Sequence, residues 1–308
     1  MIDLVTVGWL TIDDIVLLDH TCKPNVLGGG ALYSAVGALI WSDRVGVHSV
    51  TGRKYIDDVL GRISAYGLDA TGINAIEGNG LELWLLHETA SDKQQIPRLS
   101  SSTAAEMDAG RGPLPAAYRG AHGFHIAPQS PDGSFENLKK LRALAPEASI
   151  TLDLMADGYV DAKRYQDLAF LEDLDAFLPS EAEVLRIFGA SDLAAWVTEQ
   201  AERHGCHVAV KLGEAGSLVC DRASGRLYRV PTYPADVLDT TGAGDAFCGG
   251  FLAGMIEERA VEECAAMGTV SASYVIEAWG ALKTRKPSSA ERDNRLAQVL
   301  ARTAPHAA

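Results

Sequence analysis

The chain has 308 residues, of which 47% are hydrophobic and 22% are charged, so it can bury an extensive core. Its formal net charge is −14, from 41 acidic against 27 basic residues. Such a negative chain has no basic surface to offset phosphate repulsion, which excludes nucleic acids and anionic membranes as expected partners. The length suits one large α/β domain or two ordinary ones.

The N-terminal residues and the cysteines indicate the compartment. The chain begins MIDLVTVGWL, without the basic start of a secretory signal, and no apolar run approaches the roughly 18 residues that cross a bilayer. The five cysteines are scattered, odd in number and free of C-x-x-C spacing, as is usual in a reducing compartment. We therefore expect a soluble, cytoplasmic protein.

Short apolar runs and helix-like segments alternate along the chain. Strands are expected over residues 2–8, 45–50, 121–127 and 148–154, and helices over 28–41, 56–66, 134–145 and 261–277. Ser288 and Glu291 form a capping-box pattern at the start of a last helix. The alternation predicts an open, parallel sheet with helices on both faces. Residues 81–88 differ, because they alternate imperfectly and run into a polar stretch, which predicts a hairpin-like insertion.

The most informative stretch is Asp239–Phe247, which reads DTTGAGDAF and precedes an apolar segment, 247–255, that reads as a buried helix. Its glycines let backbone N–H groups converge on one point, and the helix N-terminus adds its unpaired N–H groups and dipole, so the turn is an anion site. Asp245 within it is either a helix N-cap or a catalytic base beside a bound phosphate. The chain contains no P-loop string.

This string resembles the C-terminal signature of the ribokinase-like (PfkB) carbohydrate kinases. Residues 28–35, GGGALYSA, resemble the N-terminal signature of that family, with Tyr33 where sugar-binding members usually carry Asn. Residues 178–183, LPSEAE, resemble the family's P-N-x-x-E patch, with Ser180 in place of Asn. Residues 208–216, VAVKLGEAG, resemble its strand and glycine turn at the nucleotide.

The resemblance implies a ribokinase-like α/β fold: an open, mostly parallel sheet with helices on both faces, plus a small β lid. The whole chain, 1–308, would form a single domain, with lid insertions at about 12–27 and 78–101. An apolar strand face on so small a sheet could also pair two subunits, which makes a homodimer through the lid possible.

The resemblance also implies the site residues. Asp245 would be the general base, and the N–H groups of Gly242, Ala243 and Gly244 would receive the charge on the transferred phosphoryl group. The substrate would be bound by Asp13, Gly29, Gly30 and Tyr33, and the nucleotide by Lys211, Gly213, Gly216 and Thr241. Glu183 would act on Mg²⁺ through water, while Asp239 and Thr241 would hold a monovalent cation, K⁺. From the residues alone, Tyr33 could equally be a core aromatic and Glu183 a helix-terminal acid.

The predicted activity is ATP-dependent, Mg²⁺-assisted phosphorylation of a hydroxyl on a small sugar or polyol. Tyr33 favours an acceptor other than ribose or fructose, so a nucleoside or an inositol is the alternative. A ligand-binding relative without chemistry would lack Asp245 or the glycine turn, and both are intact. A dinucleotide-dependent oxidoreductase using Gly28–Gly30 fails on spacing, because G-x-G-x-x-G needs glycine where Tyr33 stands.

Overall fold

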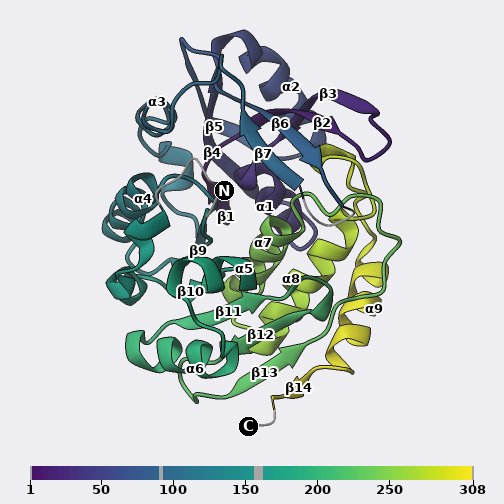
Figure 1. Ribbon diagram of the computed structural model, residues 1–308. Coiled ribbons are helices and arrows are strands. Elements are labelled where there is room, and N and C mark those ends of the chain that lie inside the picture. The colour runs from purple at the N-terminus through teal and green to yellow at the C-terminus, as the bar shows by residue number, and fades with distance from the viewer. Residues whose placement is uncertain (1, 90–92, 156–161, 307–308) are drawn as a thin grey trace.

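The computed structural model describes residues 2–89, 93–155 and 162–306 (Figure 1). Within these residues a 10-stranded sheet runs in the order β14-β13-β12-β11-β10-β9-β8-β1-β4-β5. The strands from β5 to β11 in this order are parallel, and β12, β13 and β14 are antiparallel. Their bounds are β1 Leu4–Val7, β4 Val45–Gly52, β5 Asp69–Ile76, β8 Gly123–Ile126, β9 Ser149–Leu152, β10 Ala176–Phe177, β11 His207–Lys211, β12 Ser217–Cys220, β13 Leu227–Val230 and β14 Ala304–Pro305.

Helices cover both faces of this sheet, so the predicted fold class is confirmed. On one face lie α1 (Gly30–Leu39), α2 (Ile56–Tyr66), α7 (Ala243–Ile256), α8 (Val261–Val275) and α9 (Ser289–Leu300). The other face is covered by α4 (Pro131–Leu144) and α6 (Leu193–His204), and α3 (Ala104–Gly110) packs beside β4 and β5. Short 3₁₀ turns occupy Arg53–Tyr55, Ala116–Tyr118, Ala162–Tyr165, Leu168–Asp173, Gly213–Ala215 and Ala281–Lys283.

The central strand β1 shows why the sheet is buried on both sides. Val5 and Val7 belong to the core under α4 and α6, whereas Leu4 belongs to the core under α1. Thr6 also points toward α1, and its hydroxyl donates a hydrogen bond to the Ala31 carbonyl at 2.7 Å. A strand with apolar neighbours on both faces reads as a continuous apolar run, which is the pattern of parallel sheets.

A second, four-stranded sheet stands apart from the first and is called the small sheet below. Its order is β3-β2-β6-β7, with β2 at Thr11–Val16, β3 at Cys22–Gly28, β6 at Leu81–His87 and β7 at Lys93–Pro97. Strand β2 pairs antiparallel with β3 and parallel with β6, and β6 and β7 form an antiparallel pair. These strands come from the two stretches that resemble lid insertions; the insertion limits and the single domain remain predictions.

A buried carboxylate attaches the small sheet to the main body. Glu82 on β6 accepts hydrogen bonds from Lys54 Nζ at 2.9 Å and from the Tyr55 hydroxyl at 2.5 Å, both from the turn after β4. Ser100 donates a third bond to it at 2.6 Å. The hydrogen bonds repay the cost of burying this charge and fix β6 against the main body.

Several local predictions need correction. The helix expected over 247–255 begins earlier, at Ala243. Helix α3 was not predicted, although Thr103 and Glu106 form a capping box at its start. Strand β5 was also missed, because its residues mix polar and apolar types without clear alternation. In the part of the chain that the structure describes, no helix has the length and apolarity needed to cross a bilayer.

Candidate active site

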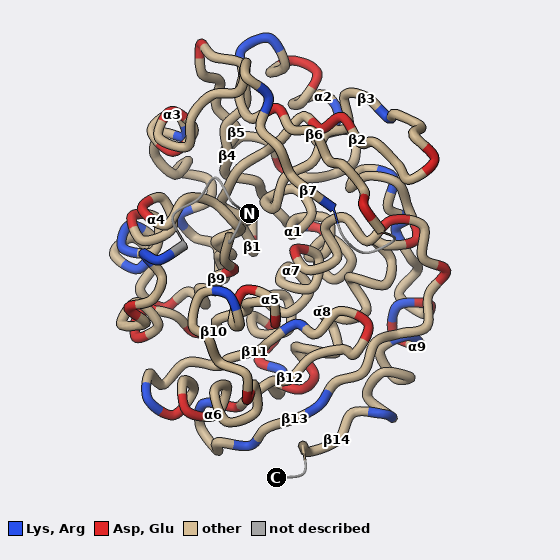
Figure 2. The backbone as a smooth tube through the Cα atoms, viewed as in Figure 1, with Lys and Arg blue, Asp and Glu red and all other residues tan. Residues whose placement is uncertain are grey.

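A cavity of about 500 Å³ opens at the carboxyl ends of the parallel strands, between the main sheet and the small sheet. Trp9 lies just beyond β1, Asp153 just beyond β9, and Lys211 ends β11. This edge is where open α/β sheets bind ligands, because loops leaving neighbouring strands diverge there. Figure 2 shows acidic segments gathered where β9, α5 (Glu181–Glu183) and α7 meet.

The start of α7 forms one wall of the cavity. Gly242 is the N-cap, with φ 75°, and a side chain there would collide with the Tyr33 ring, whose Cδ1 would lie 2.0 Å from its Cβ. Asp245 lies in the first turn of the helix, and the N-cap is Gly242. The alternative that Asp245 is the N-cap is therefore wrong. The Ala243 N–H donates to the Thr240 carbonyl at 3.2 Å, which leaves Gly242 and Gly244 as the better placed donors for a ligand.

Two carboxylates flank the glycine turn before α1. A Cβ added to Gly28 would lie 2.2 Å from Asp13 Oδ2, and one added to Gly30 would lie 2.9 Å from Asp245 Oδ1. Burial raises the pKa of Asp13 to about 7, against the lowering effects of Thr11, Lys93 and Arg98. Among the described residues Asp13 Oδ1 has no hydrogen-bond partner, so it can accept a hydrogen bond from a ligand hydroxyl.

Tyr33 combines the two roles considered for it. It borders the cavity, and it is also a core residue, only 3% exposed, with its ring against Gly242. Burial raises the pKa of its phenol well above the ordinary value, and the carboxylates of Asp239, Asp13 and Asp245 raise it further. The neutral ring therefore supports the α7 turn from below while closing the floor of the cavity.

An ion pair that the sequence did not predict lines the cavity. Lys211 Nζ pairs with Asp153 Oδ2, and both side chains are almost fully buried. Burial lowers the pKa of Lys211, but Asp153, Cys248 and Glu183 raise it by more, so the ammonium stays charged. A Cβ on Gly244 would lie 3.4 Å from Lys211 Nζ, which puts this ammonium beside the start of α7. The available signal for Asp153 was an acid directly after an apolar strand, at the edge where ligands bind.

Glu183 also lines the cavity and is part of a capping box. Its Oε2 accepts from the Ser180 N–H at 2.6 Å, and its own N–H donates to Ser180 Oγ at 3.3 Å. Burial and the neighbouring Asp153 raise the pKa of Glu183 to about 7, although Lys211 and Ser180 lower it. One turn further, in a π-helical stretch over Val184–Phe188, Arg186 stands at the cavity rim. The sequence analysis did not identify Arg186 as a residue of the site.

Asp239 lies buried beneath the α7 turn. Its Oδ1 accepts from the Thr241 N–H at 2.9 Å and from the Thr241 hydroxyl at 2.6 Å. Its Oδ2 is buried and has no hydrogen-bond partner among the described residues. An unsatisfied buried carboxylate oxygen beside a helix-start turn fits a monovalent cation, which would supply the missing charge.

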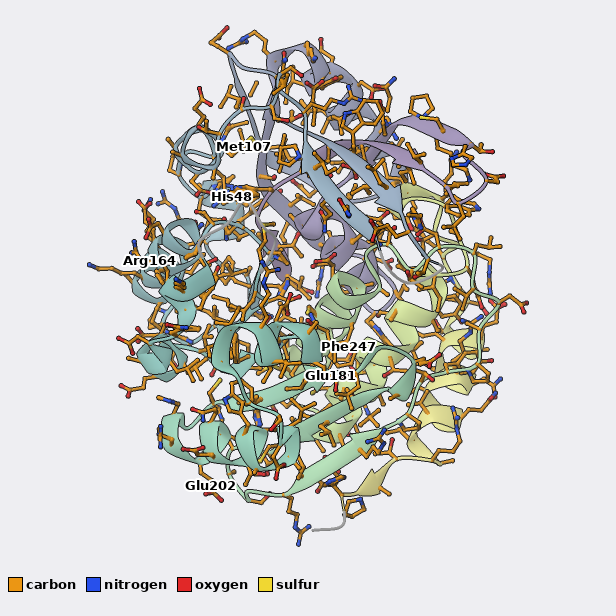
Figure 3. The ribbon with its side chains drawn as sticks, viewed as in Figure 1. His48, Met107, Arg164, Glu181, Glu202 and Phe247 are labelled. Carbon is orange, nitrogen blue, oxygen red and sulfur yellow. The ribbon has the colours of Figure 1, made fainter. Side chains whose placement is uncertain are left out.

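A smaller cavity of about 130 Å³ adjoins the first on the far side of Lys211. Gly213, Gly216, Ala243 and Gly244 form one side of it, and its apolar side chains come from the β13–α7 connection, α7 and α8, namely Tyr233, Phe247, Ala272 and Ile276. Phe247, labelled in Figure 3, lies on α7. A narrow apolar slot next to a glycine turn at a helix N-terminus suits the flat ring of a nucleotide base.

The structure therefore brings the predicted residues together around two adjoining cavities and one buried carboxylate. Gly216 and Ala243 line the smaller cavity and Asp239 lies under the turn, and the remaining predicted residues line the larger one: Asp13, Gly29, Gly30, Tyr33, Glu183, Lys211, Gly213, Thr241, Gly242, Gly244 and Asp245. The small sheet adds a residue that the sequence did not single out, Lys93, whose Nζ donates to Thr241 Oγ1 at 2.8 Å.

Comparison with known proteins gives a match to the family described as "pfkB family carbohydrate kinase" over residues 25–287. The chain belongs to the PfkB family. A cytidine kinase of Thermococcus kodakarensis is 30% identical over 288 residues, which cover 91% of this chain and 98% of that protein. A guanosine-inosine kinase of Exiguobacterium acetylicum is 25% identical over 75% of this chain and 76% of that protein.

Solved structures of the PfkB fold superpose over nearly the whole chain. A nucleoside kinase of Burkholderia thailandensis in complex with inosine has a TM-score of 0.77 and 16% identity, covering 97% of this chain and 99% of that one. A ribokinase II from E. coli in complex with ATP and Mg²⁺ has a TM-score of 0.74 and 17% identity, covering 97% and 100%. This PfkB protein is thus a phosphotransferase of the sugar and nucleoside kinase group.

Proposed function

We propose that this protein is an ATP-dependent nucleoside kinase in which Asp245 is the general base. The observation that carries the proposal is the mixed lining of the larger cavity. Asp13, the glycine turn and Asp245 supply polar groups, and an apolar wall is formed by Trp9, Leu81, Leu83, Leu85 and Met155. Leu83 is the register partner of Asp13, so this wall adjoins the polar groups. The polar groups suit a sugar, and the apolar wall suits a flat ring attached to it.

The apolar wall favours a nucleoside among the acceptors that the sequence left open. A free sugar or an inositol carries hydroxyls around its whole ring, and burying some of them against leucine side chains costs free energy. A nucleoside places its base there instead. Trp9 is 2% exposed and held by a hydrogen bond from its Nε1 to Asp108 Oδ1 at 2.8 Å, so the wall is fixed before the ligand arrives. The names of the similar cytidine kinase and nucleoside kinase are in line with this choice.

The proposed reaction follows from the positions of the carboxylates. Asp13 accepts hydrogen bonds from the ribose hydroxyls, and the remaining hydroxyl faces Asp245. That hydroxyl gives its proton to the Asp245 carboxylate as its oxygen bonds to the γ-phosphorus of ATP, and the bond from this phosphorus to the β–γ bridging oxygen breaks to release ADP. The Gly242 and Gly244 N–H groups, with Ala243 at the same helix start, stabilise the charge on the transferred group.

The nucleotide and its metal would occupy the space around Lys211. The base enters the smaller cavity, with Gly213 and Gly216 along its ribose side, and the phosphates reach Lys211 and Thr241. Oxygen ligands suit Mg²⁺, which neutralises phosphate charge when bound, and Glu183 would hold it through water. The buried, unpaired oxygen of Asp239 makes it, with Thr241, the proposed holder of K⁺.

Three further proposals concern the surroundings of the site. The small sheet would act as a lid over the acceptor. Its outer face exposes Trp84 at 38% and Ile96 at 39%, which are register partners, so two lids could pair in a homodimer. The five cysteines are all free thiols, in keeping with a cytoplasmic location.

The proposed function is tested with an acceptor panel. The purified protein is incubated with Mg²⁺ and ATP and with nucleosides, free ribose, fructose or inositol, and ADP release is measured together with the phosphorylated product. We expect nucleosides to be turned over most efficiently. Turnover of a free sugar or inositol with nucleosides inactive would overturn the nucleoside assignment and leave the family activity in place.

Asp13 gives a first prediction, on pH. Because burial raises its pKa to about 7, the carboxylate that accepts ribose hydrogen bonds forms only as pH rises through that value. We expect nucleoside binding, measured without nucleotide, to be weaker at about pH 6 than at about pH 8, with a higher Kd at the lower pH. Asp13→Asn should bind weakly and lose this pH dependence; an unchanged dependence in that variant would assign it to another group.

The cation site gives a second prediction. If K⁺ occupies the pocket beside Asp239, it orders the turn that presents the Gly242 and Gly244 N–H groups. We expect kcat to be higher in K⁺ than in Na⁺ at the same ionic strength. Asp239→Asn should reduce this difference, and equal wild-type rates in the two salts would contradict the site.

A further inference from the structure

Lys93 is a cavity residue that the family signatures do not explain. It is the first residue of β7, opposite His87 at the end of β6. Alternate residues of a strand share a face, so Lys93 and Gln95 lie on the same face of β7. Both line the cavity, as does Leu85, the register partner of Gln95 on β6. The small sheet therefore carries a cation into the cavity, beside its leucines and the polar side chains of Thr11, Asp13 and Gln95.

The ammonium of Lys93 is placed at the reacting end of the cavity. Its Nζ donates to Thr241 Oγ1 at 2.8 Å, one residue before the α7 N-cap. The group is largely enclosed and interacts electrostatically with three carboxylates, Asp239, Asp245 and Asp13. Two of these are the proposed base and the proposed sugar ligand, so the transferred group would pass beside this ammonium.

Hydrogen bonding leaves Lys93 available to a ligand. An ammonium has three donors, and within the described residues the hydroxyl of Thr241 is the only hydrogen-bond acceptor it has. Lys211, by contrast, is already neutralised by Asp153. Arg186 is exposed at the rim of the cavity. Lys93 is thus the enclosed cation of the cavity that no carboxylate within the described residues pairs with.

A purely structural role, holding the small sheet closed, explains Lys93 poorly. Its contact on the main body is a neutral hydroxyl, which attaches the sheet less strongly than a carboxylate would. A carboxylate already attaches the small sheet to the main body elsewhere, because the buried Glu82 accepts hydrogen bonds from Lys54 and Tyr55.

We propose that Lys93 contacts the phosphoryl group during its transfer, so that the small sheet supplies a catalytic cation to the reacting centre. This inference rests on the proposed phosphoryl transfer at Asp245. Charge accumulates on the oxygens of the transferred group, and an enclosed ammonium stabilises that charge more than it stabilises bound ATP or the acceptor. Lys93 would then lower the barrier while contributing little to substrate affinity.

The test compares Lys93→Met, which keeps length and removes charge, with Lys93→Arg, which keeps charge. Lys23→Met is the matched control, because Lys23 is another small-sheet lysine that lies over the Trp279 ring and outside the cavity. We expect Lys93→Met to lower kcat about 100-fold, the usual effect of removing one group that stabilises transition-state charge. KM values should stay close to wild type, Lys93→Arg should recover part of kcat, and Lys23→Met should behave as wild type.

A binding measurement separates catalysis from lid closure. Calorimetric titration of ADP, fluoroaluminate and nucleoside, which together mimic the transferred group, should show a large loss of affinity in Lys93→Met, while ADP alone and nucleoside alone bind as before. Raised KM values with unchanged kcat, or equal loss for all three ligands, would overturn the proposal. Should the wild type turn over no nucleoside, the acceptor assignment fails, and the same variants are judged on whichever acceptor of the panel is phosphorylated.

Discussion

Asp245→Asn is expected to lower kcat at least about 100-fold, with ATP affinity unchanged or tighter. The amide keeps the shape of the side chain in the first turn of α7 but cannot take the proton of the attacking hydroxyl. Removing a general base typically costs 10²- to 10⁴-fold, or roughly 3–5 kcal/mol of transition-state stabilisation. One negative charge fewer beside the γ-phosphate leaves nucleotide binding intact or improves it.

The control for this variant is Asp57→Asn. Asp57 is an exposed acid in the first turn of α2, so its replacement changes the interaction with a helix dipole without touching the cavity. Measuring kcat, nucleotide binding and melting temperature on both variants separates chemistry from helix stability. An Asp245→Asn enzyme with nearly wild-type kcat and a lower melting temperature would reduce Asp245 to a structural acid and contradict the mechanism.

The second large effect is expected at the buried ion pair. The side chains of Lys211 and Asp153 are only 12% and 4% exposed, respectively. Asp153→Leu therefore leaves the buried Lys211 ammonium without its partner. Removing one partner of a buried pair costs about 3–5 kcal/mol, because the remaining charge is left desolvated. We expect a loss of unfolding free energy of that order in urea titrations, well beyond the effect of an average substitution.

A second substitution identifies the cause. The double variant Asp153→Leu with Lys211→Met removes both charges and should recover much of the stability that Asp153→Leu loses, although it should bind ATP poorly. Glu136→Leu is the control, because it breaks an ion pair with Lys140 in which both side chains are more than half exposed, and such pairs contribute little. A double variant no more stable than the single one would show that the leucine itself disrupts the core.

The main sheet and the α7 turn could be predicted because their signals are local. The helix predicted over 56–66 was found there as α2, ended by Gly67 in the left-handed conformation with φ 97°. The glycine turn before α7 was recognised from its own residues, although the helix begins at Ala243 and not at 247 as predicted. Such a turn at a helix N-terminus predicts an anion site from local sequence alone. Such features depend on a few consecutive residues and hardly at all on tertiary contacts.

The rest of the site depends on contacts between distant segments. Asp153 and Lys211 are separated by 58 residues, and their pairing follows from the adjacency of strands β9, β10 and β11. Lys93 reaches Thr241 across 148 residues, and only the register of β6 with β7 decides which polar residue of the hairpin faces inward. A shift of one residue would turn Lys93 outward, and no pattern in the sequence sets that register.

The inner face of the small sheet has a consequence for how this enzyme would choose its substrate. The leucines that would rest on the base and the lysine that would serve the reaction belong to one antiparallel pair of strands, β6 and β7. A molecule that packs poorly against the apolar wall would hold these strands away from the reacting centre. Lys93 would then not reach the phosphate, even while the sugar stays bound. The enzyme would then discriminate between substrates mainly through the rate of phosphoryl transfer, and only weakly through binding affinity.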